Sequence, residues 1–187
     1  PHDPGFGEIN ASDAVHLDES YEVINNVYEE IKAVDDIWSE AIYSDEYVRV
    51  TFEQNLTDGR MIDVLVRSNG TLGYFEIYEE GTTHLVGQSG VIEYPEVQFI
   101  PVNGLTGPRD VFDFKIVKVN SDIEEYNLCV AEGYLECDED PYEGCYEEVE
   151  SSCDSPIYHP NRTMFLEFDF IHDDVINSTQ ADGIIGY

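Results

Sequence analysis

Apolar residues that recur at every second position, on both sides of a polar turn, restrict the fold of this chain most. They are Val48, Val50 and Phe52 before the turn and Ile62, Val64 and Val66 after it. A period of two is typical of β-strands that bury one face. The stretch Asn55-Leu56-Thr57-Asp58-Gly59 between them has the composition of a tight turn. The pattern therefore predicts two strands joined by a turn.

Later stretches repeat this pattern at short intervals. The strongest are 111–119 and 163–171, and shorter ones lie at 72–78, 82–86, 91–97 and 98–102. Pro95 and Pro101 place two of them at a sheet edge or a bend, because proline cannot donate a ladder hydrogen bond. Many short strands with one helix favour a mainly all-β chain, folded as an antiparallel, jelly-roll-like β-sandwich.

One helix is predicted near the N-terminus, over residues 20–35. Asp18 or Ser20 can cap it, and apolar residues follow at helical spacing: Ile24, Val27, Tyr28, Ile31 and Val34. Residues 1–17 contain two prolines and two glycines among a few isolated apolar residues. We interpret them as an N-terminal arm, and residues 18–187 as the sandwich domain.

Residues 120–161 differ from the rest of the chain, because they hold thirteen acidic residues, no Lys or Arg, and all four cysteines. The four cysteines recur at every eighth position, as Cys129, Cys137, Cys145 and Cys153. A disulfide-stapled β-hairpin insertion folded about Pro141 would pair Cys129 with Cys153 and Cys137 with Cys145, since an even spacing keeps all four on one face. Pairing of Cys129 with Cys137 and of Cys145 with Cys153 is the alternative. Zinc is disfavoured, because zinc sites use close C-x2-C pairs.

The net charge restricts the partners of this protein. There are 41 acidic and 8 basic residues, so the formal charge is −33. Repulsion on this scale opposes folding unless salt, bound cations or an acidic medium relieves it. We expect no nucleic acid partner, because phosphate binding needs a basic stripe. No apolar run is long enough for a membrane span.

No catalytic residues and no metal ligands are predicted. The five histidines lack H-E-x-x-H spacing, the serines lack a G-x-S-x-G context, and acidic pairs are too common here to indicate a glycosidase. We therefore expect a protein that is not an enzyme and has no cofactor. Calcium at Asp35-Asp36 or Asp138-Glu139-Asp140 is the alternative that the acidic clusters leave open.

Five N-x-[ST] sequons indicate a secreted protein with N-linked glycans. They begin at Asn10, Asn55, Asn69, Asn161 and Asn177. With ten asparagines in the chain, chance predicts about one sequon. The excess, together with cysteines suited to disulfides, favours an extracellular or cell-surface location.

Three segments between Ala14 and Asp122 resemble a module of large secreted cell-surface proteins of archaea. They read AVHLDESYEVINNVYEEIKAVDDIWSE, EYVRVTFEQNLT and GLTGPRDVFDFKI. In that family the segments recur in this order within multidomain surface proteins. The resemblance implies a β-sandwich surface module without known catalysis, and it supplies no functional residues.

The expected architecture is also similar to that of extracellular filament subunits, which are jelly-roll domains that exchange a terminal strand. This similarity implies a homopolymer, since head-to-tail contacts grow a fibre. The arm would dock on a neighbouring subunit through Phe6 and Ile9, with Ile184 and Ile185 of the C-terminal tail as the other candidates. Pairing of the arm with its own sheet is the alternative.

The predicted function is therefore a structural subunit of a surface filament or sheath. A secreted carbohydrate-binding or adhesin module, calcium-dependent or not, is the competing prediction. The 13 tyrosines of the chain fit a sugar-binding face, because their rings can stack on sugars, and they fit a subunit interface or the exposed face of a strand equally well.

We expect glycans at most of the five sequons, because each lies in or beside a predicted turn. Mass spectrometry of native material should find added mass at Asn10, Asn55, Asn69, Asn161 and Asn177. If all five asparagines are unmodified, the main sequence argument for secretion is removed.

Overall fold

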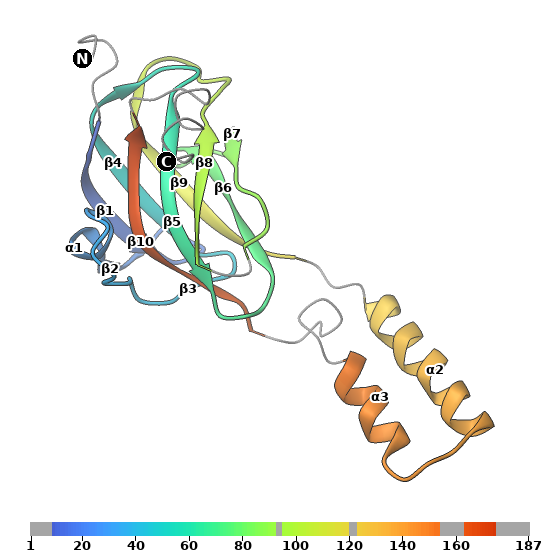
Figure 1. The fold of residues 1–187 in the computed structure, drawn as a ribbon. Helices are drawn as coiled ribbons and strands as arrows, with labels where there is room; N and C mark the ends of the chain where they lie inside the picture. Colours follow the sequence, from blue (N-terminus) through green and yellow to red (C-terminus); the bar gives the residue numbers. More distant parts are fainter. Residues whose placement is uncertain (1–8, 93–94, 120–122, 154–162, 175–187) are drawn as a thin grey trace, which may run out of the picture.

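Two antiparallel sheets pack face to face and form a β-sandwich (Figure 1). The computed structural model describes residues 9–92, 95–119, 123–153 and 163–174. One sheet has the strand order β2-β1-β4-β9-β6-β7 and the other has the order β3-β10-β5-β8. The strands are β1 (Ala11–Leu17), β2 (Val23–Asn26), β3 (Ile42–Tyr43), β4 (Tyr47–Leu56), β5 (Met61–Ser68), β6 (Gly73–Glu79), β7 (Leu85–Gln88), β8 (Glu96–Pro101), β9 (Arg109–Lys118) and β10 (Phe165–Asp174). The predicted all-β antiparallel sandwich is confirmed.

Most connections between the strands cross from one sheet to the other. This holds for β4 to β5, β5 to β6, β7 to β8 and β8 to β9. Strand β9 then returns to lie between β4 and β6. Crossed connections of this kind are characteristic of Greek-key and jelly-roll sandwiches. They make the core depend on pairings between residues that are distant in sequence.

The core lies between the sheets and is built from the alternating residues of the strands. Phe75 of β6 crosses it, with its ring centroid 5.6 Å from that of Phe114 on β9 and 5.7 Å from that of Phe168 on β10 in the opposite sheet. Burial of a side chain of this size contributes about 1.5–3 kcal/mol. The alternating set of β4 and β5 is at most 1% exposed: Val48, Val50, Phe52, Ile62, Val64 and Val66.

The helix predicted over residues 20–35 is wrong for most of its length. Val23–Asn26 form strand β2, and helix α1 spans only Tyr28–Ile31. Asp18 does not cap a helix. Instead, its Oδ1 accepts the backbone N–H of Ser20 at 2.8 Å, inside the turn that joins β1 to β2. Aspartate stabilises such turns through its own side chain, and the β-branched pair that opens β2 favours a strand.

The boundary predicted for the N-terminal arm, at residue 17, is also wrong. Ala11–Leu17 form β1, which pairs with β2 on one side and β4 on the other. Ile9 is buried and forms an antiparallel bridge with Asp173 of β10 in the same chain. Ile9 therefore belongs to the sandwich of its own chain, which is the alternative of pairing with its own sheet. Phe6 lies outside the described residues.

A buried carboxylate of β9 is paired with an arginine of the neighbouring strand β4. Asp113 is fully buried, and its two oxygens accept hydrogen bonds from Arg49, at 2.7 Å from Nε and 2.9 Å from a terminal nitrogen. Asp113 also accepts the backbone N–H of Gly81 at 2.8 Å. A bidentate pair with a further donor satisfies the buried charge.

Two other buried carboxylates are also paired with arginines. Asp173 of β10 accepts a hydrogen bond from Arg60 Nε at 2.7 Å, and Glu79 of β6 lies 2.7 Å from Arg109 Nε. Burial by itself would raise the pKa of Glu79, but hydrogen bonds from Thr106 and the charge of Arg109 lower it. The arginines thus supply counter-charges to these acids inside the sandwich.

Replacement of Asp113 by alanine should destabilise the protein by about 3 kcal/mol, because it leaves Arg49 with only the half-exposed Glu80, 3.7 Å away, as a counter-charge. This value is at the lower end of the range for a buried pair, since the Arg49 side chain is 25% exposed. Urea unfolding of the wild type and the variant measures the difference. Glu167→Ala is the control, because it removes a partly exposed partner of Arg67 and should cost at most about 1 kcal/mol. Equal losses in both variants would contradict the assignment.

Candidate functional site: a disulfide-stapled helical hairpin

The cysteine-rich insertion is a pair of antiparallel helices. Helix α2 spans Ile123–Glu139 and α3 spans Cys145–Cys153, so the predicted β-hairpin is wrong. An even spacing of eight residues fits a strand, but eight residues are also about 2.2 helical turns. The spacing alone therefore does not distinguish the two conformations. Glutamate, leucine and alanine in α2 are good helix formers.

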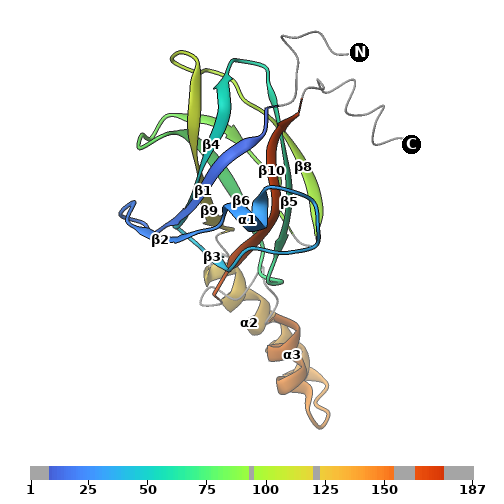
Figure 2. The same cartoon turned by 90° about the vertical axis from the view of Figure 1, so that its left-hand side faces the viewer.

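Two disulfides join the helices. Cys129 is linked to Cys153 and Cys137 to Cys145, with Cα–Cα distances of 6.0 and 5.9 Å. This is the nested connectivity that the spacing of the cysteines predicted. In Figures 1 and 2 both helices lie beyond one end of the sandwich. Each bridge restricts the unfolded chain and stabilises by about 2–4 kcal/mol.

Close contact between the helices depends on a glycine. A Cβ atom added at Gly133 of α2 would lie 2.4 Å from Cγ1 of Val149 on α3, which is too short for two carbon atoms. The ring of Tyr134, the next residue, packs edge-on against Tyr146 of α3 with centroids 5.1 Å apart. The sequence analysis did not identify Gly133. Gly133 lies midway between Cys129 and Cys137. That this position faces α3 can be recognised only when the segment is known to be a helix.

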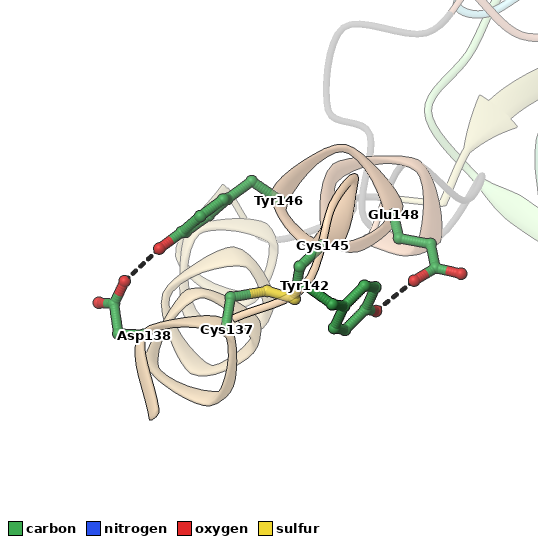
Figure 3. Close-up of a disulfide and its surroundings, with 6 residues drawn as sticks. All are labelled: Cys137, Asp138, Tyr142, Cys145, Tyr146 and Glu148. Atoms are coloured by element: carbon green, nitrogen blue, oxygen red, sulfur yellow. Dashed lines mark hydrogen bonds between the residues drawn. A yellow bond between two sulfur atoms is a disulfide. The ribbon is translucent and has the colours of Figure 1, made fainter. Parts of the chain in front are cut away.

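The tip of the hairpin carries two tyrosines, each bound to an acidic residue (Figure 3). Tyr142 donates its hydroxyl proton to Glu148, and Tyr146 donates its proton to Asp138. These hydrogen bonds raise the pKa of both phenols. Tyr142 is 56% exposed and Tyr146 is 41% exposed. The disulfide Cys137–Cys145 lies directly beside them, so the tip presents aromatic rings in a fixed arrangement.

A shallow groove of about 410 Å³ runs along the hairpin. It lies over the two disulfide-linked helices, and its lining is Cys129, Gly133, Glu136, Tyr142, Glu148, Val149, Ser152 and Cys153. Acidic groups at its margin and a small apolar floor suit a partner that offers positive charge or hydroxyl groups. The hairpin is thus a rigid, exposed and strongly acidic surface.

Three of the five sequon asparagines lie in the described part of the chain. Asn10, Asn55 and Asn69 are all exposed on the sandwich. The Nδ2 atom of Asn69 donates to the backbone oxygen of Thr163 at 2.9 Å. An attached glycan leaves one N–H on that nitrogen, so the hydrogen bond is compatible with glycosylation. Asn161 and Asn177 lie outside the described residues.

The other predicted site residues do not converge on one place. Asp138 is held by Tyr146 on the hairpin, whereas Asp35 and Asp36 lie beside β10 of the sandwich. Among the described residues, no three acidic, histidine or cysteine side chains form a group that could hold a metal ion. Ile184 and Ile185 lie outside the described residues. No described helix is long and apolar enough to cross a membrane.

Comparisons of the chain with protein-family models, with curated proteins and with solved structures find no match.

The substitution Gly133→Val should loosen the hairpin and speed reduction of its disulfides by a thiol. The added side chain overlaps Val149, and overpacking costs about 1–3 kcal/mol. Since 1.4 kcal/mol is a factor of ten, we expect reduction to be faster by roughly tenfold, measured by alkylation and mass spectrometry.

Two further variants serve as controls for this experiment. Ala131→Val adds a similar side chain at an exposed position of α2 and should leave the rate unchanged. Gly133→Ala combined with Val149→Ala should restore most of the protection. If Gly133→Val reduces no faster than Ala131→Val, close helix packing does not protect the disulfides.

Proposed function

We propose that this protein is an extracellular structural glycoprotein, a subunit that assembles with copies of itself into a surface filament or sheath. The observation that carries the proposal is an open sheet edge at β2. Disulfides and exposed sequons support the extracellular part, because disulfides persist in oxidising compartments. The resemblance of three segments to archaeal cell-surface modules agrees with this location.

Strand β2 is one of the two outermost strands of the larger sheet, and β7 is the other. It lies at the margin seen beside β1 in Figure 2. Successive side chains of a strand point to opposite faces, and here both Val23 (70% exposed) and Ile24 (48% exposed) are uncovered. An edge strand with apolar side chains is a template for another strand. The edge strand β8 is different, because it ends in Pro101 and follows Pro95, which discourage pairing.

The two ends of the chain are the candidate donors. Ile9 bridges Asp173, so the described residues that adjoin the two terminal segments are neighbours on the sandwich. The N-terminal segment contains Phe6, and the C-terminal segment Gly183-Ile184-Ile185-Gly186-Tyr187 is the other apolar one. Addition of either to β2 of the next copy would be a heterologous contact, which grows a fibre.

The test is deletion of residues 1–8, combined with electron microscopy of the purified protein. Residues 9–17 must stay, because they form part of the sandwich. If the N-terminal segment is the donor, the truncated protein should remain a folded monomer and form no fibres. Deletion of residues 183–187 tests the other end in the same way.

Substitutions at the sheet edges provide the matched control. Ile24→Lys places a charge on the β2 edge and should abolish fibres, whereas Val97→Lys on β8 should not, although Val97 is also exposed. Size-exclusion chromatography measures the loss of assembly. Wild-type protein that stays monomeric at high concentration, or assembly unaffected by Ile24→Lys, would contradict the proposal.

The second candidate function is a carbohydrate-binding or adhesin module, and the hairpin tip favours it. Tyr142 and Tyr146 expose their rings beside Glu148 and Asp138, an arrangement in which rings can stack on a sugar while carboxylates accept its hydroxyl protons. A glycan array distinguishes the two functions. Binding that Tyr142→Ala and Tyr146→Ala abolish would support the adhesin.

A further inference from the structure

Helix α2 has apolar residues on two opposite faces, and α3 packs against only one of them. Cys129, Gly133 and Cys137 lie on the face toward α3, where both disulfides and the close contact between the helices are made. At 3.6 residues per turn, Leu128 and Leu135 lie on the other side of the helix. Their side chains are 59% and 63% exposed. In Figure 1 no described helix or strand lies on the side of α2 that faces away from α3.

The spacing of the exposed apolar residues suits a second helix. Leu128, Ala131 and Leu135 follow one another at intervals of three and four positions, and all three are exposed. This is the spacing of positions a and d in a heptad, along which helices pack side by side. A helix with apolar residues on more than one face is typical of a helix that packs against more than one neighbour. The outer face of α2 therefore has the pattern of a helix-binding surface.

The disulfides hold this outer face in a fixed shape. The bridge of Cys129 to α3 adjoins Leu128, and the bridge of Cys137 to α3 lies two residues beyond Leu135. A binding surface that is already ordered loses little conformational entropy when a partner binds. The stapled hairpin thus offers the apolar stripe without a folding step.

Charge determines which kind of helix the stripe can accept. Glu132 and Glu139 are exposed and follow Leu128 and Leu135 by four positions each, which places them along one side of the stripe. The segment 120–161 around them has thirteen acidic residues and no lysine or arginine. Charged residues that flank an apolar seam select partners of opposite charge. A helix with lysine or arginine beside its apolar face is complementary to this surface.

The same charge disfavours other occupants. A second copy of this chain would bring two acidic hairpins together, and like charges repel across such a contact. Nucleic acids and anionic lipid surfaces are repelled for the same reason. These exclusions leave a cationic partner that also has an apolar face.

We propose that the outer face of α2 binds a basic amphipathic helix of a partner protein. The apolar side of that helix would lie on Leu128, Ala131 and Leu135, and its basic residues would lie beside Glu132 and Glu139. Amphipathic helices are recognised in this way through apolar anchors at helical spacing. Helix α2 has 17 residues and is about 25 Å long, which is enough for about two heptads of contact. The proposal does not rest on assembly through β2.

The test titrates the full-length protein with two synthetic peptides at about 0.15 M sodium chloride. The first peptide has leucine and alanine at positions a and d and lysine or arginine at the remaining positions. The second has the same composition in an order that forms no apolar face. General attraction to a chain of charge −33 is the same for both peptides. Calorimetry should therefore show that the first binds at least about tenfold more tightly, because only this peptide covers the leucines.

Substitutions in the stripe locate the binding. Leu128→Gln combined with Leu135→Gln keeps good helix formers in α2 and should weaken binding of the first peptide at least about tenfold, to the level of the second. Val97→Gln is the matched control, because it removes an exposed apolar side chain from the sandwich, and it should leave the affinity unchanged. Circular dichroism verifies that each variant is folded.

Substitutions of the acids test the charge. Glu132→Gln combined with Glu139→Gln should weaken binding by about threefold or more, because each exposed ion pair contributes modestly. The control is Glu53→Gln combined with Asp110→Asn, which removes two exposed charges from the sandwich and should have no effect.

Three results would overturn the proposal. The first is equal affinity for the two peptides, which would show only general attraction of cations. The second is binding of the first peptide that the leucine substitutions leave intact, since the peptide would then lie elsewhere. The third is a dimer of the protein alone, seen by analytical ultracentrifugation, that the leucine substitutions dissociate, because a second copy would then be the occupant. Ile24→Lys at the β2 edge should bind the first peptide as the wild type does, which separates this test from that of assembly.

Discussion

Pairing of buried carboxylates with arginine is the interaction on which this sandwich depends. Asp113, Asp173 and Glu79 lie on strands of both sheets, and Arg49, Arg60 and Arg109 neutralise them. Loss of one partner of such a pair costs far more than loss of an exposed one. With 8 basic residues against 41 acidic ones, the chain has few other cations to replace them. Most of the remaining negative charge lies on the surface, where water and ions screen it.

The sandwich could be predicted because apolar residues at every second position of a strand share one face, and that face is the buried one. Phe112, Phe114 and Ile116 of β9 share one face for the same reason as the residues of β4, and all three are buried. Helical spacing was less reliable. Val27 and Ile31 are buried as the predicted helix requires. Ile24 is instead exposed on strand β2, because the pairing of β2 with β1 outweighs the helical spacing of a few apolar residues. Local pattern contains no information about such tertiary pairing.

The candidate sites could be predicted only in part. The spacing of the cysteines indicates the nested pairing of Cys129 with Cys153, but it fits a strand as well as a helix. The contact of Gly133 with Val149 requires the helical conformation first.

In this account, the buried arginine–carboxylate pairs stabilise the fold, and repulsion between the unpaired surface carboxylates opposes it. Added salt screens that repulsion and should therefore stabilise the protein. The most direct measurement is the free energy of urea unfolding at low and high sodium chloride, for the wild type and Asp113→Ala. The Debye length falls from about 10 Å at 0.1 M to about 3 Å at 1 M salt, so repulsion between surface acids should weaken and stability should rise. The loss caused by Asp113→Ala should stay nearly constant, because buried pairs are screened little. Stability that falls with added salt, or a penalty for Asp113→Ala that disappears at high salt, would contradict this account.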